Sequence, residues 1–149
     1  MEKEFIPYEQ ALALKELGFD EPCLIDYNIE QGKMYIEHHE DGITNTELHE
    51  TTDQLNEEKL ERGLEKEEFL YEYSYAAATW NQAFRWFREK YNFHHYIEPI
   101  HRNSKIQYEY CVVNSSEDAK EFNEDDIIST YEEAELECIK KLIEITKTK

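Results

Sequence analysis

Four carboxylates form the most regular charge pattern in the sequence. They recur at steps of four residues: Asp53, Glu57, Glu61 and Glu65. On a helix this spacing places the side chains along one face, with about 6 Å of axial rise between neighbours. Neighbouring phosphates of a nucleic-acid strand have a similar separation. The row therefore predicts a partner-binding site suited to a basic groove that normally holds a nucleic-acid backbone.

The same acidic row has a simpler interpretation, because charged helix faces are often only solvated. Both interpretations stay open at the level of sequence. A second candidate for partner binding is Trp86, since tryptophan is typical of binding hot spots. Trp86 lies six residues after Trp80 and does not share its helical face. It therefore either covers the edge of a sheet or anchors a partner.

The sequence contains no motif that is typical of catalysis, cofactor binding or metal binding. Its histidines occur as the pairs 38–39 and 94–95 and as two single residues, His49 and His101. Adjacent strand residues point to opposite faces, so a zinc site would need ligands from two hairpins. There is no glycine-flanked nucleophile and no phosphate-binding loop. We therefore expect no catalytic, cofactor or metal residues and no enzyme activity. The alternative is a small cytoplasmic enzyme whose site forms only in the fold.

The net charge of the chain is −19, with a pI of about 4.6. Such an acidic excess argues against direct binding to nucleic acid and to anionic membranes, because like charges repel. No apolar run approaches the roughly 18 residues of a membrane-spanning helix. The cysteines are few, odd in number and far apart, which argues against a disulfide framework. We expect a cytoplasmic protein whose partner presents a basic surface.

The elements that must position these residues centre on a helix predicted over residues 76–91. Its apolar residues recur at steps of three and four: Ala76, Trp80, Ala83, Phe84, Phe87 and Tyr91. A stripe of this kind faces a hydrophobic core. Asn92 suits the left-handed position that ends a helix, and Phe93 can then fold back over the last turn.

Three further helices are predicted. The first spans residues 8–17 and ends at Gly18. The second begins at Thr51, Thr52 or Asp53 and continues to about residue 68, anchored by Leu60 and Leu64. The last spans residues 131–146 and begins with a capping box, either Thr130 with Glu133 or Ser129 with Glu132.

Two hairpins are predicted from alternating and β-branched residues. The first joins residues 23–29 to residues 34–39, and the second joins residues 94–101 to residues 106–112. Pro99 indicates an edge position or a bulge in the second hairpin. Residues 40–52 and 115–126 are predicted to be loops.

This order of elements predicts an α+β fold. We expect one compact domain over residues 1–149, with a four-stranded, mostly antiparallel sheet and helices on one face. Residues 40–72 form an acidic, partly helical insertion in this scheme. Because the insertion has few apolar residues, we expect it to be dispensable for folding and to carry partner specificity.

Three blocks of the sequence resemble small acidic proteins carried by phages and prophages. The blocks are FIPYEQALALKELGFDEPC at residues 5–23, QAFRWFREKY at 82–91 and YEEAELECIKKLIEI at 131–145. The resemblance implies an accessory protein acting in a bacterial cytoplasm, and it transfers no functional residue. With the charge, it leads to the hypothesis of a protein that binds another protein. One form of this hypothesis is an acidic inhibitor or nucleic-acid mimic directed at a host defence or nucleic-acid-handling protein.

A weaker likeness to double-stranded RNA-binding domains concerns the order of elements alone. Such domains present lysines to phosphate at the start of their last helix. This sequence has Glu132, Glu133 and Glu135 there instead.

Overall fold

The computed structural model describes residues 4–30, 33–62, 73–114, 119–122 and 128–148. The fold is α+β, with helices and two antiparallel sheets of three strands each. The predicted fold class is therefore confirmed, whereas the prediction of a single four-stranded sheet is wrong. The contacts group the chain into two compact units, Met1–Thr79 and Trp80–Lys149. That the whole chain folds as one domain stays a prediction.

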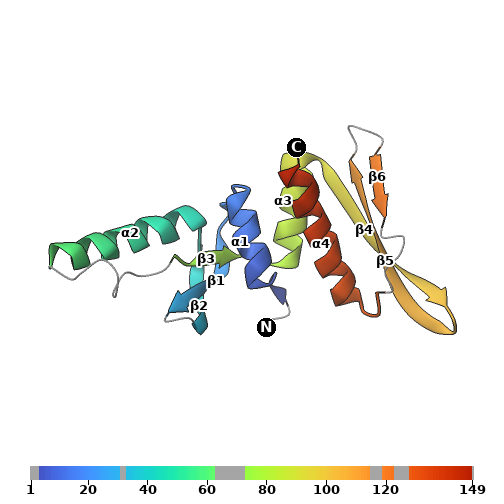
Figure 1. Ribbon diagram of the computed structural model, residues 1–149, viewed down its shortest axis with the longest axis horizontal. Coiled ribbons are helices and arrows are strands. Elements are labelled where there is room, and N and C mark those ends of the chain that lie inside the picture. Colours follow the sequence, from blue (N-terminus) through green and yellow to red (C-terminus); the bar gives the residue numbers. More distant parts are fainter. Residues whose placement is uncertain (1–3, 31–32, 63–72, 115–118, 123–127, 149) are drawn as a thin grey trace. The chain divides into compact units, whose positions relative to one another are not determined.

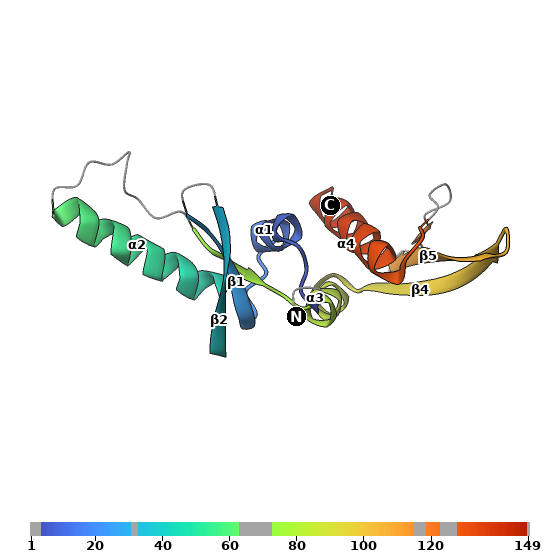
Figure 2. The same ribbon diagram turned by 90° about the horizontal axis from the view of Figure 1, so that it is seen from below.

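The first unit combines two helices with the sheet of order β2-β1-β3. Its elements are α1 (Tyr8–Glu16), β1 (Cys23–Glu30), β2 (Lys33–Ile43), α2 (Asn45–Glu61) and β3 (Tyr75–Ala77). Helix α1 packs on β3, and only the first turns of α2 lie against the sheet (Figures 1 and 2). The core of this unit is formed by Ala11 and Leu14 of α1 together with Ile25 and Tyr27 of β1, all at most 5% exposed.

Helix α1 ends where the sequence predicts, because Gly18 takes a backbone conformation that other residues avoid. Its φ angle is +85°, which costs glycine little. The turn lets the Phe19 N–H donate to the Leu14 carbonyl at 3.0 Å. Phe19 is 1% exposed and closes the end of the helix.

The predicted loop at residues 40–52 is wrong. Strand β2 continues to Ile43, and α2 begins directly afterwards with Thr44 as its N-cap. The Thr44 side chain accepts from the Glu47 N–H at 3.2 Å, and the Glu47 carboxylate accepts from the Thr44 N–H at 2.9 Å. This capping box satisfies backbone donors of the first turn, so the helix starts well before residues 51–53.

The second unit places two helices on the sheet of order β4-β5-β6. Its elements are α3 (Trp80–Tyr91), β4 (Phe93–Arg102), β5 (Lys105–Asn114), β6 (Ala119–Phe122) and α4 (Tyr131–Lys147). Helices α3 and α4 contact each other, and both lie on the same side of the sheet (Figure 1). Strand β6 falls inside the predicted loop at 115–126, so that prediction is wrong in part.

Helix α3 is shorter than the helix predicted over residues 76–91. Ala76 and Ala77 belong to β3, where they pair with Asp26 and Ile25 of β1. The helix therefore starts at Trp80 and ends at Tyr91, and the following residue, Asn92, has a φ angle of +60° as predicted. The small alanine side chains allow this short strand to be fully covered, at 0–1% exposure.

Strand β4 lies at one edge of its sheet, as Pro99 predicts. It joins β5 through Asn103 and Ser104, whose φ angles of +51° and +60° are those of a tight hairpin turn. The last helix, α4, begins with the predicted capping box of Thr130 and Glu133. Within the described residues, no helix combines the length and the apolar character needed to cross a membrane.

Candidate functional site

The first two turns of α2 are fixed to the body of the first unit by two polar side chains. Asn45 is 5% exposed; its amide group donates to the Phe19 carbonyl at 2.9 Å and accepts from the Ala76 N–H at 3.0 Å. The Asp20 carboxylate accepts from both the N–H and the hydroxyl of Thr46, at 2.8 and 2.7 Å. Leu48 and Thr52 add the remaining buried surface of α2.

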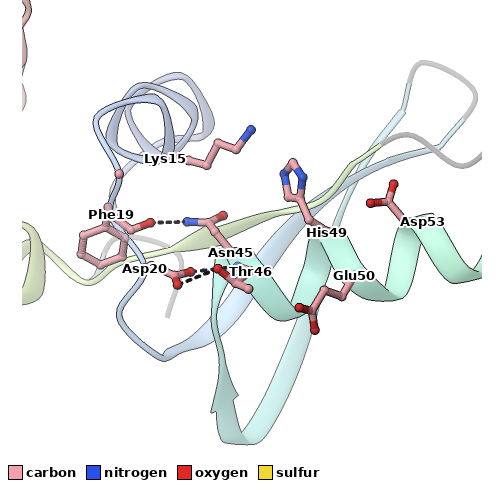
Figure 3. A pocket seen from close by; sticks show the side chains of 9 residues that line it. Lys15, Phe19, Asp20, Asn45, Thr46, His49, Glu50 and Asp53 are labelled. Atoms are coloured by element: carbon pink, nitrogen blue, oxygen red, sulfur yellow. Dashed lines mark hydrogen bonds between the residues drawn. The ribbon is translucent and has the colours of Figure 1, made fainter.

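A cleft of about 390 Å³ opens between the end of α1 and these first turns of α2 (Figure 3). Asp20, Asn45 and Thr46 lie at its base. Lys15 reaches over it from α1, and the side chains of α2 complete its wall. The full lining comprises Lys15, Gly18, Phe19, Asp20, Asn45, Thr46, His49, Glu50 and Asp53.

His49 is the most unusual group in this cleft. Its ring stacks on the Tyr73 ring, with centroids 4.2 Å apart and planes 12° apart. Its Nε2 atom is buried and has no hydrogen-bond partner among the residues that the structure describes. Burial, followed by the charge of Lys15, lowers the pKa of His49. His49 is therefore mostly neutral near pH 7, with a buried Nε2 atom that lacks a hydrogen-bond partner among the described residues.

Asp53, the first residue of the acidic row, is held at the rim of this cleft. Its Oδ1 atom accepts from the Tyr73 hydroxyl at 2.7 Å, and this hydrogen bond is the main reason that the pKa of Tyr73 is raised. Tyr73 thus connects the cleft to the acidic row, because its ring stacks on His49 and its hydroxyl donates to Asp53.

The rest of the row continues along the exposed half of α2. Glu57 and Glu61 line a shallow hollow of about 240 Å³ with Gln54 and Glu58. The predicted pair of Glu58 and Arg62 is present, with 4.0 Å between charged atoms. Both side chains are more than 60% exposed, so the pair contributes little to stability.

The predictions about the far end of α2 have two outcomes. Some fall on residues that the structure does not describe, and one names an anchoring residue that the structure shows to be exposed. Glu65 and Leu64 lie outside the described residues. Leu60, the predicted anchor, is 39% exposed. The residues that hold α2 are instead Asn45, Leu48 and Thr52. The start of the segment 40–72 thus contributes buried residues to the first unit. That the segment is dispensable for folding stays a prediction.

The structure reverses the predicted roles of the two tryptophans. Trp86 is 6% exposed and packs edge-on against Phe87, with ring centroids 5.1 Å apart. Trp80 is only half-buried. The buried face of α3 includes Ala83, Trp86 and Phe87. Trp86 is therefore packed in the second unit and is not an exposed anchor, which was one of the two interpretations that stayed open at the level of sequence.

The cysteines lie in the interior of the fold. All three are buried, and burial raises the pKa of Cys23 to about 12 and also raises that of Cys138. The thiols of Cys23 and Cys138 therefore stay protonated near pH 7, whereas the thiolate is the reactive form.

The cleft was not predicted from the sequence, although one spacing signal pointed to part of it. His49 and Asp53 lie four residues apart and so share a face of α2, but His49 fell in a predicted loop.

Comparison of the chain with protein-family models, with curated proteins and with solved structures finds no match in any of the three.

Proposed function

We propose that this protein is a phage-type accessory protein that acts by binding another protein through the acidic side of α2. The partner presents a basic surface, of the kind that normally holds a nucleic-acid backbone. The protein then acts as an inhibitor or nucleic-acid mimic towards a host defence or nucleic-acid-handling protein in a bacterial cytoplasm. The observation that supports this proposal is the acidic composition of α2 together with the exposure of its second half.

Helix α2 combines many charged side chains with exposed apolar ones, which suits the binding of a partner. Its 17 residues contain six carboxylates and one lysine, and its buried residues end at Thr52. Beyond that point the described side chains include the exposed carboxylates Glu57 and Glu61, with Leu55 at 41% and Leu60 at 39% exposure. Exposed leucines beside a row of carboxylates offer apolar contact together with charge complementarity.

Charge reversal tests this proposal directly. The row variant carries lysine in place of Asp53, Glu57 and Glu61. The control variant carries lysine in place of Glu89, Glu98 and Glu144, which changes the net charge equally on exposed positions of the second unit. Wild type and both variants are used as baits in a bacterial host lysate, and the retained proteins are identified by mass spectrometry.

We expect one reproducible partner that wild type and the control variant retain and that the row variant loses. Retention by the row variant would show that the row is only a solvated face. Absence of any reproducible partner would contradict the proposal as a whole. A gel shift with DNA and RNA at about 150 mM salt checks the expectation of no direct nucleic-acid binding.

A second candidate function is a small enzyme, and His49 is the observation that favours it. A neutral imidazole at the wall of a cleft is suited to proton transfer, and Lys15 and Glu50 line the same cleft. A metabolite library screened by thermal shift separates the two functions. A ligand whose shift is abolished in His49→Gln would support the enzyme, whereas partner capture should not change in that variant.

A further inference from the structure

The β1–β2 hairpin gathers three side chains of the kind that bind metal ions. Asp26 pairs with Glu37 across the two strands. His39 lies two residues after Glu37 and therefore points to the same face of β2. One ligand atom from each of the three residues lies within 4.8 Å of the other two. From the sequence we expected a metal site to need two hairpins; a single hairpin supplies these ligands.

A bulge in β2 sets the position of His39. Ile25 pairs with His38, and Cys23 pairs with Ile43, so residues 39–42 lie opposite Leu24 alone. Gly42 makes this irregularity possible with a φ angle of +81°, and a Cβ atom there would approach Pro22 Cβ to 3.1 Å. Bulges redirect side chains and recur next to functional sites.

The carboxyl group of Asp26 is buried, and only one of its two oxygens has a hydrogen-bond partner among the described residues. Its side chain is 1% exposed, and its Oδ1 atom lies 2.7 Å from His39 Nε2. Its Oδ2 atom is buried and, within the described part of the chain, has no hydrogen-bond partner. A buried oxygen without a donor costs folding free energy. A carboxylate oxygen of Glu37 within 4.8 Å adds like-charge repulsion. A cation among the three groups would remove both penalties.

We propose that Asp26, Glu37 and His39 form a binding site for one divalent transition-metal ion, with Zn²⁺ as the preferred occupant. The imidazole nitrogen selects this class, because Mg²⁺ and Ca²⁺ favour sites made entirely of oxygen. In the bound form His39 Nε2 coordinates the ion in place of its contact with Asp26 Oδ1, and the unpartnered Asp26 Oδ2 atom is available as the carboxylate ligand. Three protein ligands leave at least one coordination position for water.

The surroundings of the cluster allow an ion to enter. Glu37 is exposed and the His39 side chain is 24% exposed, whereas Asp26 lies beneath them. An ion can therefore bind first to the two outer groups and then reach the buried carboxylate. Binding ties β1 to β2 and stabilises the folded form by mass action.

The test is titration of the tag-free full chain with ZnCl₂ by calorimetry, with native mass spectrometry for stoichiometry. We expect one ion per chain. Asp26→Asn, Glu37→Gln and His39→Gln should each raise the Kd for Zn²⁺ by about 10- to 100-fold, as loss of a ligating or supporting group does elsewhere. The matched control is His38→Gln, an exposed histidine on the opposite face of β2, which should leave the Kd unchanged.

Three results would overturn this site. The first is no binding of Zn²⁺ by wild type. The second is an unchanged Kd in Glu37→Gln; because Glu37 is exposed, this variant stays folded even where Asp26→Asn does not. The third is equal affinity for MgCl₂, which would contradict the metal class. The cysteines do not confuse the titration, because all three are buried in the folded chain.

Discussion

Helices α2 and α4 begin with the same capping motif but differ in how much of their length is buried. Both are 17 residues long, and both begin at a threonine followed three residues later by a capping glutamate. In α4 the buried residues continue along the helix: Ala134, Cys138, Ile139, Leu142 and Ile143. In α2 they stop at Thr52. Local signals thus decide where a helix begins, whereas the length of its apolar stripe decides how much of it packs.

The largest expected difference between the two helices is in core packing. Leu142 of α4 is 1% exposed, and Leu60 of α2 is 39% exposed. Leu142→Ala should lower the free energy of unfolding by about 2–5 kcal/mol, because it leaves a cavity. Leu60→Ala should lower it by no more than about 0.5 kcal/mol. Urea denaturation measures both, and equal losses would contradict the difference in packing.

Acid should destabilise the unit that contains α4. The His95 ring on β4 stacks on buried Phe84, with centroids 3.7 Å apart. Burial, followed by the charges of Arg88 and His94, lowers the pKa of His95 from 6.5 to about 4. Between these two values the unfolded chain binds the proton and the folded chain does not. Stability is therefore highest above pH 6.5 and falls as the pH drops towards 4.

The size of this loss is about 1–2 kcal/mol once screening by solvent is allowed for. Urea midpoints between pH 7 and pH 4.5 measure it. His95→Phe keeps a ring beside Phe84 and should show a smaller fall over this range. His101→Gln, at another exposed position of β4, should behave as wild type. The same fall in His95→Phe would assign the acid sensitivity to other groups.

Removal of the N-cap threonine should have a global effect on stability for α4 and a local effect for α2. Thr44→Ala and Thr130→Ala each delete one capping hydrogen bond, worth about 1 kcal/mol. For α4 this loss should appear in the global urea midpoint. For α2 it should appear mainly as faster amide hydrogen exchange beyond Thr52, where no buried side chain holds the helix. Exchange that is unchanged in Thr44→Ala would show that packing, and not the cap, maintains this half.

The elements that could be predicted from the sequence are those whose signals are local. The capping box at Thr130, the turn at Gly18 and the proline of β4 each appear in the structure as expected. Thr44 and Glu47 carry the same signal as Thr130 and Glu133. It was missed because the segment around it lacks a strong apolar stripe, which left Thr51 as a competing start.

The remaining features depend on pairing between distant residues. Strands β3 and β6 have three and four residues, too few to show a period of their own. The pairing of Ala76 with Asp26 places Ala76 in β3, so that α3 starts only at Trp80. The contact of His39 with Asp26 depends on the pairing of β1 with β2. Each of these outcomes is decided by tertiary contacts.

The proline at the edge of β4 has a consequence for the behaviour of the chain at high concentration. Edge strands are templates for strand addition, which leads to aggregation. An incoming strand that met β4 at Pro99 would find no N–H to bond, and the exposed side chains of Glu98 and His101 flank this position. Replacement of Pro99 would restore the missing donor. The proline thus disfavours the addition of a further strand at this edge.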